Sequence, residues 1–99
     1  MSLADAGFDG SMKRVEAELL TDGGNEAVVR LPGRRFPGLL IQGDSLHILR
    51  DDMAEVVRAC EHGDLTVAGE SASLLLSNLD ALLARYSAAL EDHEIPRPF

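Results

Sequence analysis

The chain has 99 residues and a mass of 10.6 kDa, and nine basic against seventeen acidic side chains give it a net charge of −8. This length accommodates one domain, since a typical domain needs about 100–150 residues. Hydrophobic residues make up 45% of the chain, which excludes a disordered protein. No apolar run approaches the roughly 20 residues of a membrane span, and the first residues lack the order of a signal peptide. A single cysteine excludes a disulfide framework and favours a cytoplasmic location.

The acidic residues are concentrated in the second half of the chain. Residues 44–94 contain eleven acidic and three basic side chains, whereas residues 13–43 contain four acidic and five basic ones. An acidic field repels phosphate backbones, so we expect no direct binding of nucleic acid. The same field can steer a basic protein partner, although an excess of acid can also serve solubility alone.

The N-terminal half predicts a lead-in followed by three strands. Residues 1–11 have no hydrophobic period and are expected to be a flexible lead-in. Apolar and charged side chains alternate over residues 13–21 and again over residues 26–31, which predicts two half-buried strands. Asp-Gly-Gly-Asn at 22–25 joins them, because these residues tolerate the positive φ of a tight turn. Residues 39–42 (LLIQ) predict a short interior strand.

The C-terminal half predicts two helices separated by a fourth strand. Residues 43–45 (GDS) offer an N-cap to the first helix, whose apolar side chains recur every three or four positions. Cys60 lies on this stripe and is expected to be buried. His62-Gly63 ends the helix. Residues 64–68 (DLTVA) predict a short strand, and residues 69–71 open a second helix rich in leucine.

The predicted order is therefore β-β-β-α-β-α, an α+β fold in which two helices pack on a small antiparallel sheet. Residues 12–94 form the single domain, and residues 95–99 form an extended tail that contains two prolines. The leucines at 74–76 cannot all face one sheet, because neighbours on a helix point about 100° apart. A second buried face is implied, so we expect a homo-oligomer, most simply a homodimer.

The string Gly43-Asp44-Ser45-Leu46 gives its name to the GDSL hydrolases, in which the serine is a nucleophile that needs a histidine base oriented by an acid. The Asp-x-x-His block of that family is absent here, and the chain is about half the length such an enzyme needs. His47 and Asp51 share a helix face, but no spacing supplies the three or four ligands of a zinc site. We therefore expect no enzyme, no metal and no cofactor.

The segment Pro32–Gly38 (PGRRFPG) is the candidate partner-binding site. Two Pro-Gly pairs hold Arg34, Arg35 and Phe36 between them, and arginine and aromatic side chains are the usual anchors of protein interfaces. In the structural alternative, Phe36 packs inward and the two arginines pair with glutamates of the sheet, namely Glu16, Glu18 or Glu26.

Residues 13–61 resemble the HicB-type antitoxin module. The likeness lies in the Gly-interrupted hairpin, the segments Leu31-Pro32-Gly33 and Phe36-Pro37-Gly38, the string Gln42-Gly43-Asp44-Ser45-Leu46 and the amphipathic helix after it. The block VVRLPGRRFPGLLIQGDSL also resembles a small family of uncharacterised bacterial proteins. The antitoxin resemblance implies a partial RNase-H-like β-β-β-α-β unit without catalytic acids, which neutralises a small basic RNase and assembles as a dimer or tetramer. Many members also bind DNA through a separate motif, whereas the C-terminal helix here has one basic residue, Arg85.

The sequence thus predicts a cytoplasmic interaction protein, with antitoxin-like neutralisation of a small basic protein as its most specific form. The alternative is a homo-oligomeric protein that binds a small ligand between sheet and helices. A GDSL-type hydrolase is the remote alternative.

Overall fold

A computed structural model describes residues 11–99, so all but the last residue of the predicted lead-in 1–11 lies outside the described residues. Three strands are followed by two helices, which confirms the α+β class: β1 (Glu18–Leu19), β2 (Val28–Arg30), β3 (Gly38–Leu39), α1 (Gly43–Glu61) and α2 (Leu65–Asp92).

The three strands form one antiparallel sheet in the order β1-β2-β3. The strands are shorter than the alternating patterns predicted, although pairing continues beyond them through bonds such as the one from the Leu40 amide to the Ala27 carbonyl at 2.8 Å. The Val28 amide, at the start of β2, donates to Thr21 Oγ1 at 3.1 Å. Turn residues at 22–25 and the loop at 32–37 leave little chain for longer strands.

The predicted fourth strand at residues 64–68 is wrong, because this segment forms the N-cap and first turn of α2. Gly63 takes a positive φ of 70° after α1 ends, and glycine adopts this conformation without a steric penalty. Asp64 then caps α2, since its Oδ1 accepts from the Val67 amide at 3.1 Å. A side-chain cap stabilises a helix by about 1 kcal/mol, which outweighs the strand preference of a β-branched pair such as Thr66-Val67.

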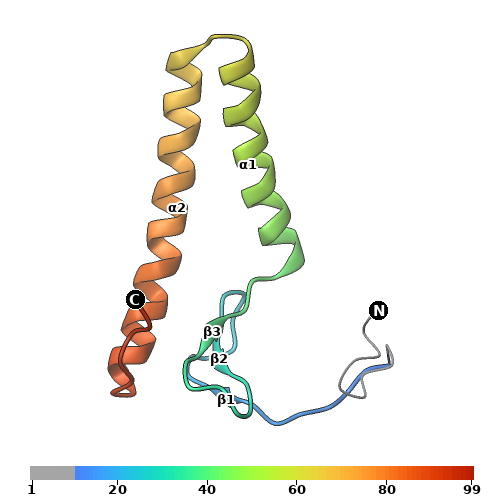
Figure 1. Cartoon of the computed structure of the whole chain (residues 1–99), viewed down its shortest axis with the longest axis vertical. Helices are drawn as coiled ribbons and strands as arrows, with labels where there is room; N and C mark the ends of the chain where they lie inside the picture. The colour runs from blue at the N-terminus through green and yellow to red at the C-terminus, as the bar shows by residue number, and fades with distance from the viewer. Residues whose placement is uncertain (1–10) are drawn as a thin grey trace.

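The two helices lie side by side as an antiparallel hairpin that extends away from the sheet, as Figure 1 shows. The prediction that both helices pack on the sheet is therefore wrong for α1, which packs on α2. The reason is length. The turn between the helices is short, so α2 runs back along α1, and its 28 residues exceed the 19 of α1. At 1.5 Å per residue, α2 is about 13 Å longer, and its last turns reach the sheet.

The hydrophobic core lies where these last turns meet the sheet. Val28 and Leu90 are fully buried, and Tyr86 and Ala89 complete the cluster. The partly buried side chains around it come from all parts of the chain: Leu20, Leu39 and Ile95. After α2, residues 95–99 form no helix or strand, and the Phe99 ring stacks on the Tyr86 ring with centroids 6.3 Å apart. The core thus ties the C-terminus to the strands.

Candidate functional site

The loop at residues 32–38 begins with a β-turn of defined type. The Arg34 amide donates to the Leu31 carbonyl at 3.2 Å, and Gly33 has a φ of 77°. Proline at the second position and a positive φ at the third are the marks of a type II turn, which almost any residue but glycine would strain. The sequence Leu31-Pro32-Gly33-Arg34 therefore sets the direction in which the loop leaves β2.

Two further hydrogen bonds hold the loop to the rest of the fold. Arg30 Nη1 donates to the Arg35 carbonyl at 3.3 Å. The Tyr86 hydroxyl donates to the Pro37 carbonyl at 2.7 Å, and this bond is buried. Pro37 itself is buried, although the residues before it are exposed or half-buried. The backbone is thus fixed at its start, middle and end, and the core residue Tyr86 provides the last attachment.

The three side chains predicted to bind a partner lie together at the surface. Arg34 and Arg35 are exposed and Phe36 is half-buried. The Arg35 guanidinium carbon lies 5.0 Å from the centroid of the Phe36 ring, within the range of a cation–π contact. Phe36 and Arg34 also border an open apolar hollow on the sheet, together with Val29, Leu31 and Leu40.

The structural alternative for the two arginines required glutamate partners on the sheet. Two of the three glutamates are engaged elsewhere: Glu18 Oε1 lies 2.6 Å from Arg30 Nε, and Glu26 Oε1 lies 2.8 Å from Arg85 Nη1. Glu16 forms no ion pair in the part of the chain that the structure describes. Within residues 11–99, neither Arg34 nor Arg35 has an ion-pair partner. Their guanidinium groups therefore remain available to another molecule.

The ion pair between β1 and β2 changes the acidity of both its members. The hydrogen bond and positive charge of Arg30 lower the pKa of Glu18 below its ordinary value of 4.5. The hydrogen bond from Glu18 likewise raises the pKa of Arg30. The Glu18 side chain is 65% exposed and that of Arg30 is 26% exposed, so solvent screens the pair and its effect on stability is small.

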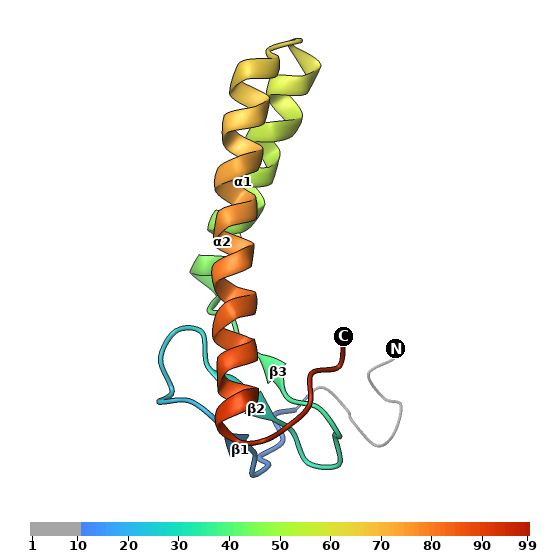
Figure 2. The ribbon, with the colours of Figure 1, turned by 90° about the vertical axis from the view of Figure 1, so that its left-hand side faces the viewer.

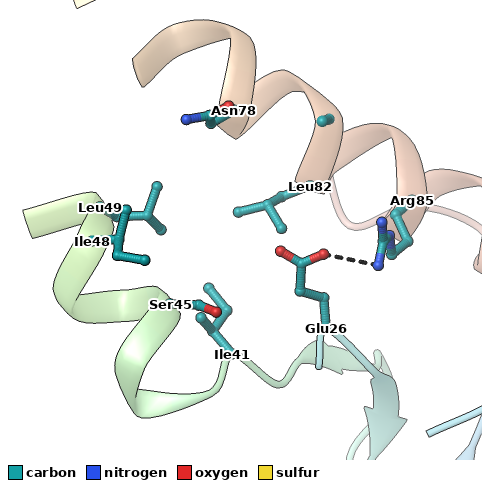
Figure 3. A pocket seen from close by; sticks show the side chains of 9 residues that line it. Glu26, Ile41, Ser45, Ile48, Leu49, Asn78, Leu82 and Arg85 are labelled. Atoms are coloured by element: carbon teal, nitrogen blue, oxygen red, sulfur yellow. Dashed lines mark ion pairs between the residues drawn. The ribbon is translucent and has the colours of Figure 1, made fainter. Parts of the chain in front are cut away.

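A second candidate site is a cavity of about 250 Å³ between α1, α2 and the residues before β2. In Figure 3 the Glu26 and Arg85 side chains meet at its wall, with Leu82 facing them from α2. Ser45 and Asn78 add polar groups. The remaining lining is aliphatic: Ile41, Ile48, Leu49 and Ala81. The volume suits a small molecule with an apolar body, but the two charged groups of the wall already neutralise each other.

Ser45, the residue of the GDSL string, lies in the first turn of α1. The N-cap expected within residues 43–45 is wrong, because the cap position is Gln42, which makes no side-chain cap bond, while Asp44 Oδ1 accepts from the Ser45 amide at 2.8 Å. The three histidine rings contact other groups, at distances of 2.7 to 3.4 Å: Asp51, the Arg58 carbonyl and the Leu20 carbonyl. No three potential metal ligands cluster anywhere in residues 11–99.

The sequence did not predict the roles of two residues: Tyr86, which holds the loop, and Glu26, which was expected as a partner of the loop arginines and pairs with Arg85 instead. Tyr86 lies 49 positions from the carbonyl it holds, and no local pattern announces such a contact. Its only signal is that it is the single tyrosine, placed on the apolar stripe of a helix. A buried tyrosine needs a partner for its hydroxyl, so an acceptor was to be expected, though not which one.

Within the described residues, no helix is long and apolar enough to cross a membrane. Residues 12–99 match a family of unknown function, DUF6959. No curated protein and no solved structure matches the chain.

Proposed function

Because the chain belongs to DUF6959, a family of unknown function, we propose a role from its own surface: it is a non-catalytic protein-binding module. The loop at residues 32–38 makes the contact. The observation that carries this proposal is the pair of exposed, unpaired guanidinium groups beside Phe36, on a backbone held at three points. A loop already fixed in its bound conformation loses little entropy when it binds.

The chemistry of the loop selects a class of partner segment. Arginine binds carboxylates with two parallel hydrogen bonds, which a lysine cannot match. Phe36 and the apolar hollow beside it offer a surface for a hydrophobic side chain. The complementary segment therefore carries acidic and apolar residues next to each other.

This proposal is tested by capture with a charge-reversed loop. We expect tagged protein to retain a stoichiometric partner from a lysate of its own host, and the double variant Arg34→Glu/Arg35→Glu to lose it. The matched control, Lys13→Glu/Arg14→Glu, makes the same change of net charge at exposed residues outside the sheet and should retain the partner. Circular dichroism establishes that each variant is folded. Equal retention by all three proteins would contradict the proposal.

The antitoxin-like form keeps the non-catalytic binding role but places the contact on the acidic surface of the chain rather than on the arginine loop. Its support is the net charge of −8 and the resemblance of residues 13–61, while the last strand of the implied unit is replaced by the start of α2. In this form the captured partner is small and basic and leaves at high salt, because opposite net charges hold the complex. An acidic partner would favour the loop contact alone.

The small-ligand alternative rests on the cavity between the helices and the sheet. It has less support than the loop, since Glu26 and Arg85 satisfy each other across 2.8 Å. A ligand would have to displace one partner of this pair or be held by Ser45 and Asn78 alone. The loop, in contrast, offers charged groups that make no ion pair within the described residues.

A further inference from the structure

Each helix of the hairpin carries two mainly apolar rows rather than one. One row, here called the contact row, faces the other helix and consists of buried or half-buried residues. In α1 it contains Ser45, Leu49, Asp52, Val56 and Ala59, and in α2 it contains Ala68, Ser71, Leu75, Leu82 and Tyr86. These positions recur every three or four residues, as a helix face requires, apart from the gap between Leu75 and Leu82, where the intervening Leu79 is 41% exposed.

The second row consists of the residues that directly follow contact-row positions. In α1 these are Leu46, Arg50, Met53, Val57 and Cys60. In α2, Leu76 and Leu83 follow contact-row leucines in the same way. Successive residues of a helix are about 100° apart, so each second row lies roughly a quarter-turn from the contact between the helices.

Both second rows lie on the same side of the hairpin. Moving one residue forward along a right-handed helix rotates the side-chain direction in a fixed sense about the helix axis. Viewed from one end of the hairpin, this rotation runs in opposite senses in two antiparallel helices. In an antiparallel pair, whose contact rows face each other, a step forward on either helix therefore points to the same side. We call this the apolar side.

The hollows of the molecule agree with this assignment. An apolar hollow of about 510 Å³ is lined by Leu79 and Leu83 together with the C-terminal Phe99. The cavity near Glu26 is instead lined by Ile48 and Ala81, which precede contact-row residues. Figure 2 views the hairpin along the plane of its two helices and shows the C-terminal tail on one side and the turn between β1 and β2 on the other.

The apolar side is exposed along most of its length. Its large apolar side chains have exposed fractions of 47 to 59%: Leu46, Met53, Val57, Leu76 and Leu83. On the opposite side of α1, three of the five residues that directly precede contact-row residues are acidic: Asp44, Asp51 and Glu55. The other two are Ile48 and Arg58. The two sides of one hairpin thus differ in chemistry, and only one of them can be buried without burying carboxylates.

We propose that the apolar side packs on the apolar side of a second copy of the chain, so that two hairpins form a four-helix dimer. This inference is independent of the loop at residues 32–38. Over the length of α1 the side is about 28 Å long and, across two helices, about 20 Å wide. That is a flat area of about 560 Å², which the relief of the side chains raises toward the roughly 800 Å² per partner of a stable interface.

The area of the apolar side approaches what a stable homodimer buries, and charge decides which sides of two copies can meet. At a net charge of −8, two copies repel each other wherever carboxylates face carboxylates. The apolar side avoids this repulsion, because its two second rows contain no carboxylate, and their one charged residue is the cation Arg50. A two-fold axis through the side pairs the same patch with itself, as in most homodimers.

The test compares leucine variants that differ only in the side of the helix. Light scattering coupled to size exclusion at tens of micromolar should give twice 10.6 kDa for the unmodified chain. Leu76→Glu should raise the dissociation constant of the dimer at least 100-fold, so that this variant runs as a monomer. Leu74→Glu is the matched control: Leu74 is 58% exposed and Leu76 is 59% exposed, but Leu74 precedes the contact row, so this variant should stay dimeric.

The same comparison is available on α1 and keeps the proposal open to contradiction if one variant fails to fold. Leu46→Glu should give a monomer and Ile48→Glu a dimer, although both side chains are nearly 60% exposed. A monomeric unmodified chain would overturn the proposal, including the case in which a different protein covers this side. If Leu74→Glu and Leu76→Glu weakened the dimer equally, or if neither weakened it, the assignment of the interface to the apolar side would be overturned.

A label at Cys60 gives a second, independent measurement. Cys60 is the only cysteine and is exposed, and it follows Ala59 of the contact row. A nitroxide on Cys60 should report a distance between two labels in the unmodified protein, and this dipolar signal should vanish in Leu76→Glu. If light scattering shows a fully labelled protein to be dimeric and the dipolar signal is still absent, the interface lies far from the apolar side.

Discussion

The two ends of this molecule differ in how completely the chain buries its own apolar side chains. At the sheet end, Val28 and Leu90 are fully inaccessible and Tyr86 is 7% exposed. Along the hairpin, between residues 48 and 82 of the described chain, only Ala59 and Ala68 are buried. One end thus has a small core of its own, whereas the other presents leucines that nothing in the same chain covers.

The contacts of the two ends also differ in sequence separation. The sheet end is closed by bonds between distant residues, such as Tyr86 to Pro37 and His93 to Leu20, which are 49 and 73 positions apart. The hairpin is built from neighbouring helices joined by a turn capped by Asp64. A long-range core fixes the fold of one chain, and a local hairpin with a spare apolar side is suited to assembly.

The largest effect is expected from removing the core at the sheet end. Leu90→Ala takes away the larger of the two fully buried side chains, and a buried leucine replaced by alanine costs about 2–5 kcal/mol. Leu74→Ala, on the exposed hairpin, should change the unfolding free energy by no more than about 0.5 kcal/mol. Urea denaturation followed by circular dichroism measures both. If the two variants lost stability equally, the contrast between the ends would be wrong.

An intermediate effect is expected from the bond that joins the core to the loop. Tyr86→Phe removes the donor to the buried Pro37 carbonyl while keeping the ring that stacks on Phe99. The loss should be about 0.5–1.5 kcal/mol. Amide hydrogen exchange should also quicken at Arg34, whose amide closes the turn of the loop. Unchanged exchange there would mean that the loop is held without Tyr86.

The sequence was sufficient for most of the fold because its signals are local. Alternation, glycine turns and helical periodicity predicted the three strands and two helices in their observed order. The fourth strand at 64–68 was predicted from Thr66 and Val67, whereas Asp64 and the length of the following helix decide the outcome. The loop residues Arg34 and Arg35 lie at the surface together, but their lack of glutamate partners depended on where Arg30 and Arg85 pair.

The expected burial of Cys60 is wrong, because this side chain is exposed, and the reason for the error is more instructive. Helical periodicity places Cys60 on one apolar stripe with Leu46 and Leu49, but the structure divides that stripe into two rows. Leu49 faces α2, while Leu46 and Cys60 are exposed. Periodicity shows that a side chain prefers burial but not what covers it. A residue that packs inside one chain and a residue that packs against a second copy give the same pattern.

The smallest effect is expected from the ion pair at the edge of the sheet, and its pH dependence has a definite sign. Because Arg30 lowers the pKa of Glu18, the pair adds stability at a pH above the ordinary glutamate value of 4.5, and this stability is lost as the pH falls through the lowered value. Glu18→Gln should therefore lower the unfolding midpoint slightly at pH 7, and the difference should shrink in acid and in high salt. Glu16→Gln, which changes an exposed glutamate with no ion pair in residues 11–99, is the control. A midpoint difference that persisted in acid would show that Glu18 acts through packing rather than charge. The sheet edge would then belong to the end of the molecule that buries its own apolar side chains.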